Sequence, residues 1–341
     1  ILQNMNHLDK KIRAFIKLGK YLQEEKIDSK LHNLIIETEN NNRWFTYKNT
    51  LKALKIWADT LTKKNILKWL SKYSFNNEKV RTIGIIMAGN IPIVGFHDLI
   101  CVLFTKHIAV VKTSSSDPFL IPFLYDILVK FEPELGKRVI FKDKIDFVDA
   151  VIATGNNITI RNINDKFNSY PCILRGARNS VAVLNGNEST KDLKLLSDDI
   201  LGYYGFGCRS VTKIYVPNNY NFTPLKKILG EKSELITLSD YLNNFKKNKA
   251  INEIIESKFH IVGKLILIED KSIYAEISSV NYEYYDTKDS LINEINSNNK
   301  IIQCVVGNNN QNRFIKFGEA HKPNLWNYAD NIDTIEFLLS L

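Results

Sequence analysis

Uninterrupted apolar segments alternate with helix-like segments along the middle of the chain, and this alternation limits the folds available to it. Residues 80–88, 107–113 and 146–154 read as strands, and residues 94–106 and 118–131 read as helices between them. Strands that are apolar along their whole length are typical of a parallel sheet with helices on both faces. The pattern predicts an α/β protein with a Rossmann-type parallel sheet domain.

A second α/β unit follows the first. A helix-like segment at residues 188–205 runs into the loop that holds Cys208, and the strand after that loop ends at Pro217. Apolar segments at residues 264–270 and 301–307 continue the alternation. Residues 1–80 differ, because their apolar side chains recur at helical spacing and predict a helical N-terminal region.

Composition and net charge limit the number of domains and the kinds of ligand that the chain can be expected to bind. The chain has 341 residues, 44% of them hydrophobic, which supports a large core and two domains. Its formal net charge of +9 is dispersed, which suits a nucleotide, coenzyme A, a nucleic acid or only a solvated lysine-rich face. Because the basic residues are not interleaved with aromatic ones in a recognisable module, we expect no nucleic-acid partner.

The cysteines and the apolar segments indicate a cytoplasmic protein without a membrane-spanning segment. The four cysteines show no CxxC or Cys/His spacing, so we expect neither a disulfide scaffold nor a metal site. The first residues carry scattered charges and no continuous apolar core, which favours a cytoplasmic protein. The most apolar run, residues 83–104, contains Asn90, Pro92, His97 and Asp98. Since these are costly in hydrocarbon, we expect a buried strand, turn and helix, and no integral membrane segment.

Cys208 stands in the stretch GYYGFGCRSVTKIYVP, after three glycines and before Arg209. Glycines let a backbone approach a substrate closely, and a neighbouring cation favours the reactive thiolate. A packed cysteine at the entrance of a strand explains the same stretch equally well. The other cysteines, Cys101, Cys172 and Cys304, lie in apolar runs and read as core residues.

Asn90 lies in the segment AGNIP, directly after the first expected strand. Open parallel sheets bind ligands at this edge, and an uncharged amide suits a developing oxyanion. A helix cap is the commoner role for asparagine at such a place. The segment is not a GxGxxG fingerprint, so the usual dinucleotide motif is absent.

Two further strand ends carry polar residues. Lys112, with the hydroxyls of Ser114 and Ser115, can bind a phosphate or a ribose, although a helix cap beside a solvated lysine is the alternative. Gly155 and Asn156 open the next helix-like segment. Three such turns in successive units suggest a nucleotide site.

With these segments in order, the chain resembles the acyl-CoA reductases related to the fatty acid reductase of bacterial bioluminescence, the LuxC-like family of the aldehyde dehydrogenase superfamily. The resemblance runs from about Val80 to Leu338. Its most specific segments are AGNIPIVGFHD, KTSSSD, AVIATGNN, RNSVAVLNGNES, YYGFGCRSVTKIYVP and NLWNYADNIDTIEFL. It implies an aldehyde-dehydrogenase-like fold with a cofactor domain and a catalytic domain. The expected parts are a helical region at 1–80 packing on the cofactor domain, an NADP(H)-binding domain at 81–180, a catalytic domain at 181–315 and a C-terminal segment at 316–341 returning to the cofactor domain.

The resemblance implies a role for each candidate residue. Cys208 falls on the superfamily's nucleophilic cysteine. Asn90 falls on the asparagine that completes the oxyanion hole with the cysteine's own backbone N–H. Lys112 falls on the lysine that contacts the adenosine ribose, and Gly155 with Asn156 falls on the turn near the cofactor.

Three other positions refine the resemblance. Glu276, in the segment AEISS, matches the glutamate that orients the nicotinamide ribose. Ser115 stands where NAD-dependent members usually carry a glutamate, so repulsion against a 2′-phosphate is absent and NADPH is the expected cofactor. Leu174 stands where hydrolytic members have the glutamate that activates water, which favours reduction of a thioacyl intermediate over its hydrolysis.

The resemblance thus implies NADPH-dependent reduction of a fatty acyl-CoA to the aldehyde, through a thioacyl-enzyme on Cys208. Two alternatives stay open: another reductase of this fold that acts on an acyl phosphate or an aldehyde, and a catalytically silent scaffold. Arg175, Arg178 and Arg209 can either meet phosphates or stay solvated. A homodimer, or a partner enzyme that supplies or takes the acyl group, is compatible with the same function.

Overall fold

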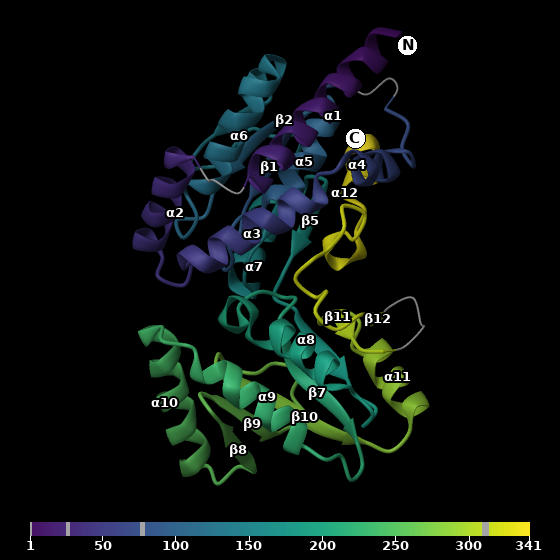
Figure 1. The fold of residues 1–341 in the computed structure, drawn as a ribbon. Coiled ribbons are helices and arrows are strands. Elements are labelled where there is room, and N and C mark those ends of the chain that lie inside the picture. The colour runs from purple at the N-terminus through teal and green to yellow at the C-terminus, as the bar shows by residue number, and fades with distance from the viewer. Residues whose placement is uncertain (1, 25–27, 76–78, 309–313) are drawn as a thin grey trace. The chain divides into compact units, whose positions relative to one another are not determined.

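The chain divides into two compact units, each with its own sheet (Figure 1). Unit 1 consists of Ile1–Gly176 and Asn324–Leu341, and unit 2 consists of Ala177–Pro323. The residues that this computed structural model describes are 2–24, 28–75, 79–308 and 314–341. Both units combine parallel strands with helices, so the predicted α/β class is confirmed.

Unit 1 is built on a five-stranded parallel sheet, counted over the described residues, with strand order β3-β2-β1-β4-β5. The strands are β1 (Thr82–Ile86), β2 (Ile108–Lys112), β3 (Val139–Phe141), β4 (Ala150–Thr154) and β5 (Cys172–Arg175). The middle residues of β1, β2 and β4 are buried, as their uniformly apolar sequences predict. In this order β1 is flanked by β2 and β4, and the chain reverses direction across the sheet beside β1. Ligands of such sheets bind outside the carboxyl ends of the strands at this point.

Helices surround this sheet. They are α1 (Leu2–Gln23), α2 (Ser29–Asn41), α3 (Tyr47–Thr60), α4 (Lys63–Leu70), α5 (Phe96–Phe104), α6 (Leu120–Phe131), α7 (Asn157–Phe167) and α12 (Thr334–Leu339), with short 3₁₀ turns η1 (Pro133–Lys137) and η3 (Ala329–Asn331). Helix α5 packs on β1 and β2 and is buried on nearly every side, because its sequence is apolar all round. The most apolar run therefore forms a buried strand, a turn and a buried helix, as predicted. None of the described helices is both long enough and apolar enough to span a membrane.

Unit 2 holds a seven-stranded sheet, again counted over the described residues, with order β12-β11-β6-β7-β10-β9-β8. Its strands are β6 (Asn179–Val183), β7 (Val211–Pro217), β8 (Phe259–Val262), β9 (Leu265–Glu269), β10 (Ser279–Tyr285), β11 (Ile302–Val306) and β12 (Phe314–Ile315). Its helical segments are α8 (Thr190–Leu201), η2 (Gly202–Gly205), α9 (Thr223–Glu234), α10 (Ser239–Ile254) and α11 (Lys288–Ser297). The sheet is parallel except for the β8–β9 hairpin, and α8 and α9 lie against it (Figure 1).

The unit boundaries differ by a few residues from those expected at 180/181 and 315/316. Unit 1 gives way to unit 2 after Gly176, and the chain returns to unit 1 after Pro323. Residues 316–323 stay with unit 2 because buried Asp199, in α8, accepts the N–H groups of Gly318 (2.6 Å) and Ala320 (3.1 Å).

Candidate active site

Asn90 is exposed and lies in the turn that follows β1 at the carboxyl edge of the unit 1 sheet. The N-cap of α5 is Gly95, without a side-chain cap, so Asn90 is not the cap of that helix. The turn approaches the neighbouring strand end closely: a Cβ at Gly89 would lie 2.3 Å from the Ser114 hydroxyl oxygen. Only glycine allows these two loops to meet.

The same turn is held by a residue that sequence reasoning did not single out. Ile93 adopts a φ of 53°, which is unusual for a β-branched residue, and its N–H donates to Asp117 Oδ2 at 2.7 Å. Asp117 follows the serines of the loop after β2 and is 4% exposed. Its only sequence signal was an acidic residue before Pro118, which also suits a helix cap. Asp117 therefore ties the Asn90 turn to the Lys112–Ser115 loop.

Burial raises the pKa of Asp117 from 3.8 to about 6. At a pH between these two pKa values, Asp117 is ionised in the unfolded chain but stays protonated in the folded protein. The free energy of unfolding therefore falls as the pH rises from about 4 to about 6. Asp117→Asn keeps an acceptor for Ile93 and should flatten this part of the pH–stability curve, measured by urea unfolding. Asp199, whose pKa burial also raises to about 6, leaves a residual slope. If Asp117→Asn leaves the dependence of the free energy of unfolding on pH unchanged, the raised pKa is not that of Asp117.

Lys112, Ser114 and Ser115 lie beside the Asn90 turn. Lys112 ends β2 with an exposed side chain, and its carbonyl accepts the N–H of Met87 at 3.0 Å. Ser115 is exposed, and its carbonyl accepts a hydrogen bond from the Asn41 amide (3.1 Å). An ammonium group and hydroxyls thus line the carboxyl ends of β1 and β2.

Gly155 and Asn156 complete this edge of the sheet. They follow β4, which pairs with β1 on the side opposite β2. Asn156 is the N-cap of α7 and accepts the Thr159 N–H at 2.8 Å. A Cβ on Gly155 would contact the Thr159 side chain at 3.0 Å, so the turn is tight. A cation, hydroxyls, a helix N-terminus and a close backbone approach fit an anionic dinucleotide at this edge.

Cys208 belongs to unit 2 and follows a strained turn. Tyr203, Tyr204, Gly205 and Gly207 all have positive φ values, of 50°, 60°, 85° and 96°. Positive φ at two tyrosines costs energy and is concentrated at functional sites in proteins. Cys208 itself is half-buried at the end of this turn, just before β7.

The backbone around Cys208 is fixed by serine hydroxyls. Ser210 donates to the Phe206 carbonyl at 2.6 Å, and Ser180 donates to the Cys208 carbonyl at 2.8 Å. Burial raises the pKa of the other cysteines, Cys101, Cys172 and Cys304, and disfavours their thiolates. Cys208 differs from them in its position, because it lies half-buried at the end of the strained turn before β7.

Glu276 is exposed and lies in unit 2 before β10. A small cavity in this unit is lined by Tyr204 and Gly205, from the turn before Cys208, and by residues 275–280. The structure therefore groups Glu276 with the Cys208 turn in unit 2. It groups the other six candidate residues along one sheet edge of unit 1. Among the described residues, no cluster of three or more His, Cys, Asp or Glu side chains is arranged to hold a metal ion.

Arg175 does not offer a phosphate contact. The residue is 3% exposed, and its guanidinium donates to both carboxylate oxygens of Asp98 at 2.8 Å and to the Thr334 hydroxyl at 2.8 Å. Arg178 and Arg209 donate to the backbone carbonyls of Asn299 (3.2 Å) and Ala320 (3.3 Å). Arg175 is thus part of the folded interior, and neither role expected for it, a phosphate contact or a solvated side chain, applies.

Solved structures with the same architecture are aldehyde dehydrogenases. An indole-3-acetaldehyde dehydrogenase in complex with NAD⁺ matches with a TM-score of 0.62 and 11% identity, over 88% of this chain and 71% of that one. An NAD-dependent aldehyde dehydrogenase from Sinorhizobium meliloti matches with a TM-score of 0.63 and 12% identity, over 90% and 71%. The chain therefore has the aldehyde dehydrogenase fold, as expected.

Residues 25–253 match the family model described as "Acyl-CoA reductase (LuxC)", and the chain belongs to this family. The match begins before Val80, where the sequence resemblance was expected to start. A long-chain acyl-protein thioester reductase of Photorhabdus laumondii is 24% identical over 203 residues, 54% of this chain and 42% of the relative. The long-chain acyl-protein thioester reductase 2 of Photobacterium leiognathi is 26% identical over 146 residues, 38% and 30%. The aligned part spans less than half the length of these curated relatives.

Proposed function

We propose that this chain reduces a fatty acyl thioester to the aldehyde, with NADPH as the reductant and with Cys208 as the nucleophile. The observation that carries the proposal is the strained turn that presents Cys208, in a chain of the acyl-CoA reductase family. The absence of a carboxylate at Leu174, which lies half-buried in β5, supports reduction rather than hydrolysis.

The proposed reaction has two steps, acylation of Cys208 and reduction of the resulting thioacyl-enzyme. The Cys208 thiolate attacks the thioester carbonyl, the Asn90 amide and the Cys208 N–H stabilise the oxyanion, and the carrier leaves as its thiolate. The chemistry that a reduced nicotinamide supplies is hydride donation to the thioacyl carbon. Collapse of the resulting thiohemiacetal frees the aldehyde and regenerates the thiolate.

The cofactor is proposed to lie along the unit 1 sheet edge. Lys112 and Ser114 would meet its ribose and phosphates, with the Gly155–Asn156 turn beside it, and Glu276 would bind the nicotinamide ribose. Ser115 carries no charge that would repel a 2′-phosphate, which supports NADPH. Of the solved neighbours named above, one is a complex with NAD⁺ and the other is named as NAD-dependent, so the assay should compare the two reductants directly.

The acyl carrier is proposed to be coenzyme A, after the family's description. The curated relatives are named for acyl-protein thioesters, so a partner enzyme that carries the acyl group is the competing donor. The test supplies purified protein with a long-chain acyl-CoA and either NADPH or NADH, and follows aldehyde by trapping as a hydrazone. Aldehyde formed faster with NADPH supports the proposal. If acyl-CoA yields no aldehyde, or if aldehyde forms only when an acyl-protein is supplied, the assignment to coenzyme A is wrong.

Asn90→Ala should lower kcat for aldehyde formation by about 10²–10³, because one oxyanion donor is removed. KM should change little, since the amide acts on charge that develops only in the transition state. Steady-state rates with acyl-CoA measure both parameters. A variant with unchanged kcat would show that Asn90 has no part in the chemistry.

A further inference from the structure

The loop at residues 270–278, which carries Glu276, has no regular secondary structure. It connects β9 to β10 in unit 2. Its backbone carbonyl groups need hydrogen-bond donors, because unpaired polar groups next to a core are unfavourable. Side chains of the adjacent strands supply most of these donors.

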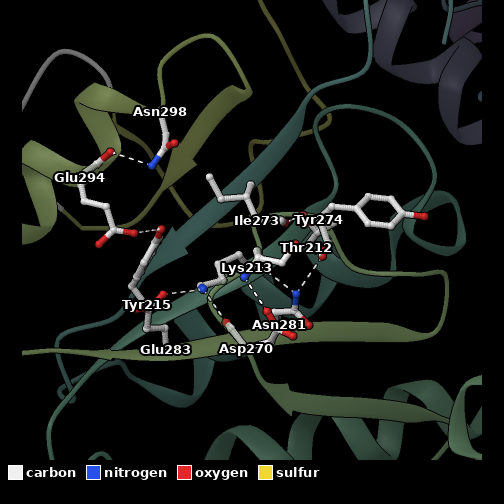
Figure 2. A network of polar contacts seen from close by, with 11 residues as sticks. Thr212, Lys213, Tyr215, Asp270, Ile273, Tyr274, Asn281, Glu283, Glu294 and Asn298 are labelled. Atoms are coloured by element: carbon white, nitrogen blue, oxygen red, sulfur yellow. Dashed lines mark hydrogen bonds and ion pairs between the residues drawn. The ribbon is translucent and has the colours of Figure 1, made fainter. Parts of the chain in front are cut away.

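Figure 2 shows the contacts that hold the first half of this loop. The Asn281 amide donates to the carbonyls of Ser272 (2.9 Å) and Tyr274 (2.8 Å). The Thr212 hydroxyl donates to the Ile273 carbonyl at 2.7 Å. The Lys213 ammonium group donates to the Asp270 carbonyl at 2.6 Å. Four backbone carbonyls between residues 270 and 274 are therefore fixed by three side chains.

These three donors are built into the sheet. Thr212 and Lys213 are on β7 and Asn281 is on β10, where Asn281 pairs in register with Lys213. Lys213 is fully buried, Asn281 is 4% exposed and Thr212 is 8% exposed. Glu283 balances the Lys213 charge at 2.7 Å. Since strands of a packed sheet are rigid, these donors fix the loop more firmly than exposed side chains would.

The second half of the loop is anchored from α10. The amide of buried Asn248 donates to the Ile277 carbonyl at 2.7 Å, and Ser279 N–H donates to the Glu276 carbonyl at 2.9 Å. The backbone of Glu276 is thus held on both sides, while its carboxylate stays exposed.

We propose that Asn281, Thr212 and Lys213 are positioning residues that hold the 270–278 loop so that Glu276 is preorganised for the cofactor ribose. The inference rests on the function proposed above for Glu276. A preorganised carboxylate binds more tightly because no loop ordering is needed on binding. None of the three side chains has to touch the cofactor.

The test compares three variants with the full chain by NADPH fluorescence titration. Asn281→Asp keeps the shape but places an oxygen opposite two carbonyls, and Thr212→Val removes one donor. Tyr215→Phe is the matched control: Tyr215 is also buried on β7, but its hydroxyl donates to Glu294 in α11 at 2.9 Å and not to a carbonyl of the loop, and phenylalanine keeps the ring that packs beside Ile273. We expect Asn281→Asp to raise the Kd for NADPH about tenfold and Thr212→Val severalfold. Tyr215→Phe should leave the Kd unchanged, and all three should be acylated by acyl-CoA at the parent rate.

A fourth variant separates this inference from the proposed function. If Glu276→Gln weakens NADPH binding but Asn281→Asp and Thr212→Val do not, the positioning role is wrong while the role of Glu276 stands. If Tyr215→Phe weakens NADPH binding as much as the other two variants do, the effect is a general loss of packing in unit 2, and the inference is overturned. If Glu276→Gln leaves the Kd unchanged, the role of Glu276 and the inference both fall, whereas acylation of Cys208 is unaffected. Where Asn281→Asp does not fold, Thr212→Val decides.

Discussion

Cys208→Ala is expected to lower aldehyde formation from acyl-CoA by at least about 10⁴-fold, because the proposed covalent route loses its nucleophile. NADPH affinity should be retained, since the proposed binding residues remain. Aldehyde production and NADPH fluorescence titration measure the two effects separately.

Cys172→Ser is the control for this substitution. Cys172 is half-buried at the start of β5, its thiol donates to the Phe167 carbonyl (3.4 Å), and a hydroxyl can take over that contact. It should keep nearly full activity. Substantial aldehyde formation by Cys208→Ala, or its loss in Cys172→Ser with the fold intact, would contradict the role of Cys208.

Arg175→Leu is expected to have the largest effect on stability. The substitution leaves the Asp98 carboxylate buried without its cation, and removing one partner of a buried pair typically costs about 3–5 kcal/mol. The Thr334 hydroxyl also loses its contact to Arg175, which connects the C-terminal segment to β5. Urea unfolding should show the loss as a lower midpoint with an unchanged slope.

An exposed ion pair provides the comparison. Lys166 and Asp146 lie 2.7 Å apart with about half of each side chain accessible, so Lys166→Ala should lower the free energy of unfolding far less than Arg175→Leu. Adding Asp98→Asn to Arg175→Leu should recover part of the lost stability, because the uncompensated charge is removed. If Arg175→Leu costs no more than Lys166→Ala, the buried pair is not what holds β5 to the C-terminal segment.

The sheets could be predicted because their strands are apolar in sequence. In unit 1 the strands expected at 80–88, 107–113 and 146–154 correspond to β1, β2 and β4, and their ends agree within a few residues. Continuous apolar runs are read locally, and parallel packing between helices follows from them.

The polar interior could not be predicted in the same way, because its partners are far apart in the chain. Arg175 pairs with Asp98 across 77 positions, and Lys213 pairs with Glu283 across 70. A lysine inside the strand VTKIYVP gives no indication of which carboxylate will compensate it. The same holds for Asp117, whose partner is the backbone of Ile93, in a turn that adopts an unusual φ.

The candidate site was predicted from glycines, strand ends and the family resemblance. The structure groups Asn90, Lys112 and Gly155 with their neighbours along one sheet edge, as strand order requires. The positive φ at Tyr203 and Tyr204 had no signal in sequence, because tyrosine rarely adopts it and only the neighbouring glycines are permissive.

The covalent step on Cys208 can be tested most directly by trapping the acyl-enzyme. The protein is incubated with a long-chain acyl-CoA in the absence of NADPH, digested, and analysed by mass spectrometry. We expect one acyl group per chain on the peptide containing Cys208, removed by hydroxylamine and converted to aldehyde when NADPH is added. Acylation confined to another cysteine, or an adduct at Cys208 that NADPH does not discharge, would contradict the proposed mechanism.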